Sequence, residues 1–151
     1  MTQKIKKIVL LVEDNPDDLE LTLDAFRQHE MDDQVQVVRN GEEALDCLFG
    51  EGDYAQQGAF CPKLTLLDLN LPKMSGLQVL KRLRQDQRTR RLPVVVLTSS
   101  SQEEDRLTSY NLGANGYVRK PVSYEAFMGA VKALRLYWLD LNELPGEGVG
   151  E

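Results

Sequence analysis

The sequence is poor in cysteine, histidine and long apolar runs, and each shortage excludes a class of protein. Its 151 residues include two cysteines, Cys47 and Cys61, and the single histidine His29. The cysteines form no CxxC pair and have no metal-ligand spacing with His29, so we expect reduced thiols in a cytoplasmic protein. No apolar run approaches the length of a transmembrane helix, so we expect no membrane association.

Basic residues are also in the minority, with 18 Lys and Arg against 24 Asp and Glu, a net charge of -6 and a pI near 4.9. Proteins that bind nucleic acid usually show a basic face, so we expect no nucleic-acid partner. The exception is a local run of Lys81, Arg82, Arg84, Arg88, Arg90 and Arg91. This run is either a solvated helix face or a patch that steers an acidic partner.

The remaining composition is that of a globular domain, with 42% hydrophobic and 28% charged residues. The length suits one domain with a real core. We expect that domain to span residues 1–144. The Gly-rich segment 145–151 is then a disordered C-terminal tail.

Short apolar runs alternate with helical patterns five times along the chain. The predicted strands cover residues 8–12, 35–38, 64–67, 93–97 and 117–119. Predicted helices follow them, with starts at Asn15-Pro16, Asn40, Ser75, Ser101 and Ser123. This alternation predicts an α/β fold, in which a parallel sheet is covered by helices on both faces.

Four predicted strands end in acidic, hydroxyl or ammonium side chains: Glu13-Asp14, Asp68, Thr98 and Lys120. The carboxyl ends of parallel strands lie at one edge of the sheet, so these side chains should converge. Two carboxylates about 4 Å apart repel by about 4 kcal/mol at an effective dielectric near 20. Lys120 offsets part of that repulsion, and a bound Mg²⁺ (or Mn²⁺) would offset the rest. The cation and Lys120 would together clamp a phosphoryl group on a carboxylate oxygen. The alternative is a structural salt-bridge network.

With these motifs in place, the chain resembles the receiver domain of two-component response regulators over roughly residues 6–139. The resemblance rests on Val12-Glu13-Asp14, on the segment 68–76 (DLNLPKMSG), on Leu97-Thr98-Ser99 and on Lys120-Pro121. It implies a flavodoxin-like (CheY-like) doubly wound fold with five parallel strands in the order 2-1-3-4-5 and five helices. It also implies a phosphoacceptor rather than an enzyme.

The resemblance further implies a role for each site residue. Asp68 would accept a phosphoryl group from a phosphohistidine of a sensor kinase. Asp14 and Asp68 would bind the metal directly, together with the backbone carbonyl of Asn70, while Glu13 would act through a water molecule. Lys120 would contact the phosphate, and the Lys120-Pro121 bond would be cis. Thr98 and Tyr117 would be the switch residues that move on phosphorylation.

A narrower resemblance is to the single-domain regulators of bacterial and cyanobacterial phytochrome kinases. It is carried by segments 12–18 (VEDNPDD), 48–52 (LFGEG), 68–73 (DLNLPK), 97–100 (LTSS) and 137–139 (YWL). It implies a phytochrome-type kinase as the partner. Since too few residues follow Leu144 for an output domain, we expect signalling by contact with a downstream protein whose identity is unknown.

Two other functions are compatible with a nucleophilic aspartate at a strand end. A haloacid-dehalogenase-like phosphohydrolase needs a second aspartate two residues further on, where this chain has Asn70. A degenerate receiver that acts only as a scaffold would be expected to lack Asp68 or Lys120, and both are present.

The end of the last predicted helix carries large apolar side chains on more than one face, including Tyr137 and Trp138. A surface helix needs one apolar stripe, and Tyr and Trp are enriched at interfaces. We therefore expect a two-fold homodimer through the last helix and strand, with Phe127, Tyr137 and Trp138 as interface residues. The alternative is that the helix packs only on its own domain.

Overall fold

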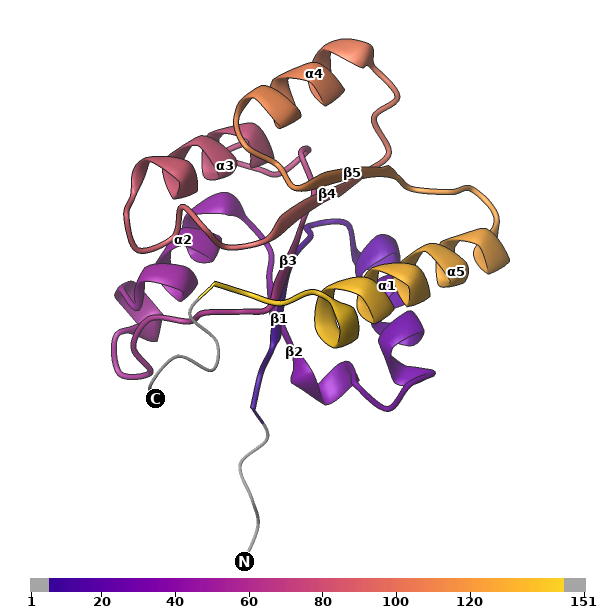
Figure 1. Cartoon of the computed structure of the whole chain (residues 1–151), viewed down its shortest axis with the longest axis horizontal. Coiled ribbons are helices and arrows are strands. Elements are labelled where there is room, and N and C mark those ends of the chain that lie inside the picture. Colours follow the sequence, from indigo (N-terminus) through magenta and orange to yellow (C-terminus); the bar gives the residue numbers. More distant parts are fainter. Residues whose placement is uncertain (1–5, 146–151) are drawn as a thin grey trace, which may run out of the picture.

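A five-stranded parallel sheet forms the centre of the computed structural model, which describes residues 6–145 (Figure 1). The strands are β1 (Val9–Val12), β2 (Val35–Val38), β3 (Leu64–Leu67), β4 (Val94–Thr98) and β5 (Gly116–Arg119). Their order is β2-β1-β3-β4-β5 and every neighbouring pair is parallel. The predicted strand order is therefore confirmed.

Five α-helices connect the strands, as predicted. They are α1 (Pro16–Arg27), α2 (Gly41–Phe49), α3 (Gly76–Gln85), α4 (Glu103–Asn111) and α5 (Tyr124–Arg135). A π-helical segment, η3 (Leu136–Leu141), continues α5, and two 3-10 turns lie at Asp32–Gln34 (η1) and Gly52–Tyr54 (η2). Figure 1 shows α1 and α5 on one side of the sheet and α2 and α3 on the other, with α4 beside β5.

The core has two layers, one on each face of the sheet. Successive strand residues point to opposite faces, so Leu10 and Val12 join the layer under α2 and α3, while Val9 and Leu11 join the layer under α1 and α5. All four side chains are at most 1% exposed. Burying a side chain of this kind stabilises the fold by about 1.5–3 kcal/mol. These strands therefore form a rigid base for the loops that follow them.

Most of the predicted helix caps are confirmed. The Asn15 side chain accepts hydrogen bonds from Asp17 N (2.9 Å) and Asp18 N (3.0 Å), and Asn40 caps α2 through Glu43 N (2.8 Å). Ser75 and Gln78 form a reciprocal capping box at α3. The Ser123 side chain caps α5.

The predicted start of the fourth helix, with Ser101 as its capping residue, is wrong. Helix α4 begins at Glu103, and its N-cap residue Gln102 makes no side-chain capping bond. Instead the Ser100 hydroxyl donates to Asp105 Oδ2 (2.6 Å) and accepts from Gln102 N (3.3 Å). Three consecutive serines offer equivalent hydroxyls, so the sequence pattern alone could not distinguish among them.

The Lys120-Pro121 bond, expected to be cis, is trans, since no peptide bond between residues 6 and 145 is cis. Trans is the form that X–Pro bonds favour. Lys120 N still donates to Thr98 O (2.7 Å). Of the expected tail, residues 146–151 lie outside the described residues. No helix within residues 6–145 is long and apolar enough to cross a membrane.

Candidate functional site

The ammonium group of Lys120 lies among three carboxylates at the edge of the sheet where the strands end. Lys120 Nζ is 2.7 Å from Glu13 Oε1, 2.8 Å from Asp18 Oδ2 and 3.3 Å from Asp68 Oδ2. The side chains of Lys120, Glu13 and Asp68 are at most 7% exposed. We call these four residues the acidic rim. It holds three carboxylates and one ammonium, a formal charge of -2.

The sheet register brings these residues together. Val12, the last residue of β1, pairs with Leu67, the last residue of β3, so Glu13 and Asp68 leave the sheet side by side. Lys120 follows the last residue of β5, and Asp18 lies in the first turn of α1. The predicted convergence of Glu13, Asp68 and Lys120 is thus what the structure has.

Glu13 and Asp68 are held in the same way, each by the backbone two residues further along. Glu13 Oε2 accepts from Asn15 N at 3.2 Å, and Asp68 Oδ1 accepts from Asn70 N at 3.2 Å. The remaining oxygen of each carboxylate faces Lys120. Such local bonds orient both carboxylates before any ligand binds.

Burial and neighbouring charges shift the ionisation of the rim. Burial, together with the nearby Asp68 carboxylate, raises the pKa of Glu13 to about 7, although Lys120 acts in the opposite direction. Burial also disfavours the charged form of Lys120. Hydrogen bonds to Asp18 and Glu13 more than offset this, so the pKa of Lys120 is raised.

We predict that the protein without divalent cations loses stability as the pH rises from 5 to 8. The pKa of Glu13 is higher in the folded chain than in the unfolded chain, so folding is favoured most when Glu13 is protonated. The contribution is fully present below pH 4.5 and is lost as the pH rises through about 7. Its upper limit is about 3 kcal/mol. Urea unfolding in EDTA measures it.

In that experiment Glu13→Gln should reduce the loss in the free energy of unfolding between pH 5 and 8. The control is Glu42→Gln, which removes an exposed carboxylate from α2 and should leave the decline unchanged. Equal slopes for wild type and Glu13→Gln would show that Glu13 is not the group responsible.

The donor set fits a hard divalent cation, because carboxylate oxygens are its preferred ligands and the rim has two uncompensated negative charges. The predicted ligands Asp14 and Asn70 directly follow Glu13 and Leu69 in the chain, and both are exposed. Within residues 6–145, no three acidic, His or Cys side chains are arranged to enclose a metal. Lys120 instead occupies the position between the carboxylates.

The two predicted switch residues meet at Ser100. Thr98, fully buried at the end of β4, accepts a hydrogen bond from Ser100 N through its hydroxyl oxygen at 3.4 Å. The hydroxyl of Tyr117 on β5 donates to Ser100 O at 3.1 Å. The hydroxyl groups of Thr98 and Tyr117 therefore both contact the backbone of Ser100.

Asp18 is the rim residue that the sequence analysis missed. An acidic residue in the first turn of a helix is ordinarily explained by the helix dipole, so Asp18 carried no separate signal. The available signal was its place in the first turn of the helix that follows the first strand, because that turn begins at the edge of the sheet where the strand ends.

The three predicted interface residues divide into two groups. Phe127 is 1% exposed and packs in the core layer under α1 and α5, so its placement at an interface is not supported. Tyr137 is 50% exposed, and its ring lies edge-on to that of Trp138, with centroids 4.9 Å apart. Only Tyr137 and Trp138 therefore remain as interface candidates.

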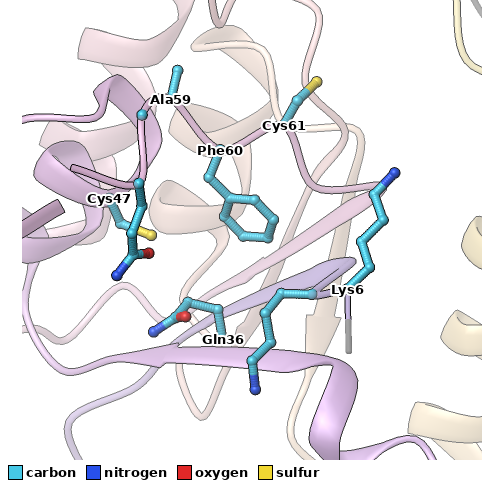
Figure 2. A pocket seen from close by; sticks show the side chains of 9 residues that line it. Lys6, Gln36, Cys47, Ala59, Phe60 and Cys61 are labelled. Atoms are coloured by element: carbon cyan, nitrogen blue, oxygen red, sulfur yellow. The ribbon is translucent and has the colours of Figure 1, made fainter. Parts of the chain in front are cut away.

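A cavity of about 470 Å³ lies away from the rim, where the chain enters the sheet (Figure 2). Its lining includes Lys6, Gln36, Cys47, Phe60 and Cys61. Both cysteines are free, as predicted, and burial raises the pKa of the Cys47 thiol to about 11. None of the residues predicted for the rim lines this cavity, so we do not assign the phosphoryl chemistry to it.

Comparison with known proteins agrees with this geometry. Residues 9–132 match the family "Response regulator receiver domain". The chain is 39% identical to the probable methanogenesis regulatory protein FilR2 of Methanothrix harundinacea, over 92% of this chain and 88% of that protein. It is 36% identical to the response regulator Rcp1 of Synechocystis, over 92% of this chain and 93% of that protein.

Solved structures give the same result. The phosphorylated cyanobacterial phytochrome response regulator RcpA superposes with a TM-score of 0.85 at 39% identity, over 93% of this chain and 99% of that one. The Mn²⁺-bound form of Rcp1 gives a TM-score of 0.83 at 36% identity, over 92% and 99%. The predicted fold class is confirmed, and the chain belongs to the response regulator receiver domain family.

Proposed function

We propose that this protein accepts a phosphoryl group on Asp68 from a phosphohistidine of a phytochrome-type sensor kinase, in a reaction that requires Mg²⁺ or Mn²⁺. The observation that carries the proposal is the contact of Lys120 with both Glu13 and Asp68 at the ends of three different strands. Membership of the receiver family supports the phosphoacceptor role. Similarity to RcpA and Rcp1 supports the class of kinase.

In this proposal a carboxylate oxygen of Asp68 attacks the phosphorus atom of the phosphohistidine. The phosphorus–nitrogen bond breaks, and the electron pair and a proton remain with the imidazole of the kinase. The Lys120 ammonium, 3.3 Å from Asp68 Oδ2, stays beside the new acyl phosphate and stabilises its negative oxygens. Thr98 and Tyr117 would respond through Ser100.

Asp14, Asp68 and the backbone carbonyl of Asn70 would hold the cation, with Glu13 joined through water. The bound cation supplies charge neutralisation for the phosphoryl oxygens. The sequence gives no support to a phosphohydrolase, because the residue two positions after Asp68 is Asn70, whose amide cannot act as a general acid or base.

The test is phosphotransfer from purified, labelled histidine kinases of the source organism. We expect a phytochrome-type kinase to transfer its label to this protein within the shortest mixing time, and EDTA to prevent the transfer. Preferential transfer from a kinase of another class would overturn the assigned partner and leave the role of Asp68 intact. Transfer at an undiminished rate in EDTA would contradict the metal requirement.

We also propose that residues 1–144 act as one receiver domain that forms a two-fold homodimer through β5 and through α5 with its continuation η3. Leu136, Tyr137 and Leu141 are each 45–62% exposed, although all three are large and apolar. Within η3 the exposed Tyr137 ring contacts Trp138, which is partly buried against the core layer under α1 and α5. Tyr and Trp are enriched at protein interfaces.

We predict that Tyr137→Ala/Trp138→Ala lowers the sedimenting mass from dimer to monomer. Loss of two interface aromatics typically weakens association by about 2 kcal/mol or more, roughly 30-fold in Kd. Sedimentation velocity over a range of concentrations measures the change. The control is Tyr110→Ala, which removes an exposed ring from α4. An unchanged mass in the double variant would contradict the interface.

A further inference from the structure

Positive charge is concentrated on the side of the domain opposite the acidic rim. Residues 81–91 hold six of the 18 basic residues and one of the 24 acidic residues, so this segment carries +5 and the rest of the chain -11. Helix α3 starts after β3 and leads to the beginning of β4. In a parallel sheet, its last turn and the following loop therefore lie at the edge where the strands begin.

The loop between α3 and β4 is held in one conformation. The Arg84 guanidinium donates to the carbonyl of Gly113 (2.9 Å) and to the carbonyl of Arg90 (3.1 Å). The Thr89 hydroxyl, which is buried, donates to Leu83 O at 2.7 Å. A loop fixed in this way loses little conformational freedom when it binds a partner.

Two arginines are also oriented before any partner binds. The guanidinium carbons of Arg82 and Arg88 lie 4.8 and 4.5 Å from the centroid of the Phe49 ring, and both groups pair with Asp86. Each side chain is still about half exposed. These guanidinium groups can thus hydrogen-bond to an external anion without first being ordered.

Three other basic residues of this segment have no acidic partner within the described part of the chain. Among residues 6–145, Lys81, Arg90 and Arg91 form no ion pair with an acidic side chain. Arg91 also lines a cleft of about 290 Å³, together with Arg88 and the apolar Leu92, Pro93 and Leu144. The lining of this cleft therefore combines positively charged and apolar side chains.

We propose that Arg82, Arg88, Arg90, Arg91 and this cleft, which we call the basic platform, bind an acidic segment of a partner protein. Carboxylates of the segment pair with the arginines, and an apolar side chain enters the cleft. The -11 charge of the remaining chain repels an acidic segment from other faces and directs it to the platform. An apolar cleft matches a peptide side chain better than the backbone of a nucleic acid.

This inference goes beyond the proposed function and does not depend on it. The platform lies at the opposite edge of the sheet from Asp68, so it remains accessible while a kinase occupies the rim. It provides a second contact surface that does not require phosphorylation.

The test is an NMR titration of the full-length ¹⁵N-labelled protein with the synthetic peptide acetyl-Asp-Glu-Leu-Glu-Asp-amide at low ionic strength. We expect amide shift changes at residues 82–92 and at Leu144. Arg91→Glu should weaken binding roughly tenfold. The matched control is Lys132→Glu, which makes the same charge change on α5, at an exposed residue on the other side of the sheet, and should weaken binding less than about twofold.

Four results would overturn the proposal: equal weakening by Arg91→Glu and Lys132→Glu, shift changes centred on α4 or α5, no binding, or equally tight binding of the uncharged control peptide acetyl-Asn-Gln-Leu-Gln-Asn-amide. Displacement of the acidic peptide by single-stranded DNA at lower concentration would favour a nucleic-acid site instead. Arg91→Gln, which removes the positive charge without adding a negative one, should also weaken peptide binding. The same titration on Asp68→Asn should give unchanged affinity for the peptide, which separates this surface from the phosphoacceptor site.

Discussion

Asp68→Asn is expected to abolish phosphoryl transfer, both from acetyl phosphate and from a histidine kinase. The amide oxygen is a far weaker nucleophile than the carboxylate, and an amide cannot form the acyl phosphate. Asp68 lies at the end of the central strand β3, where it contacts Lys120. Intact-mass spectrometry of the protein with acetyl phosphate and Mg²⁺ should show a phosphoryl adduct for wild type only.

The same substitution should stabilise the protein in the absence of divalent cations. It removes one of three carboxylates that share a single ammonium group, and a close carboxylate pair costs several kcal/mol at an intermediate dielectric. We expect a gain of about 1 kcal/mol or more in the free energy of unfolding at pH 8. Loss of labelling in a more stable protein cannot be attributed to misfolding.

The control is Asp53→Asn, which removes an exposed carboxylate from η2. It should be labelled like wild type. A phosphoryl adduct on Asp68→Asn would transfer the acceptor role to another residue of the rim, and peptide mapping of the adduct would identify it.

Lys120→Met is expected to have the largest effect on folding. It removes the only ammonium group that contacts Glu13, Asp18 and Asp68 among residues 6–145, while keeping a side chain of similar length. Leaving buried charges without their partner typically costs about 3–5 kcal/mol. We expect a loss of this size at pH 8 in EDTA, measured by urea unfolding.

Two conditions should restore much of that stability. At pH 5 Glu13 is protonated in the folded state, because burial raises its pKa to about 7, so the uncompensated charge is smaller. Addition of Asp18→Asn to Lys120→Met removes another carboxylate and should also recover stability. Two variants serve as controls. Lys120→Arg keeps the positive charge and Lys132→Met removes an exposed one, so both should lose less stability than Lys120→Met. A loss for Lys120→Met that is equal at pH 5 and pH 8 would contradict the electrostatic explanation.

The type and order of the elements could be predicted because the relevant signals are local. Runs such as Val9–Val12 and Val94–Thr98 are too apolar to be anything but buried, and caps such as Asn15 and Ser75 mark helix starts. The convergence of Glu13, Asp68 and Lys120 then follows from parallel strands without further information. For this part of the fold, hydrophobic pattern and topology were sufficient.

Predictions that needed side-chain orientation were less successful. Whether Asp18 reaches Lys120 depends on the rotation of α1 relative to the sheet, which the run Asp17-Asp18 does not reveal. Phe127 is an apolar residue on the last helix like Tyr137, and only the packing of α5 on α1 shows that Phe127 is core and Tyr137 is surface. In both cases the deciding contact joins distant segments of the chain.

The position of Lys120 in the sequence has a consequence for synthesis on the ribosome. Its partners Glu13 and Asp68 precede it by 107 and 52 residues, and β5 is the last strand in the sequence. A nascent chain therefore exposes the acidic cluster well before its counter-charge is translated. Stable docking of the first four strands should wait for the final quarter of the chain, and translation stalled before Lys120 should leave a protease-sensitive intermediate.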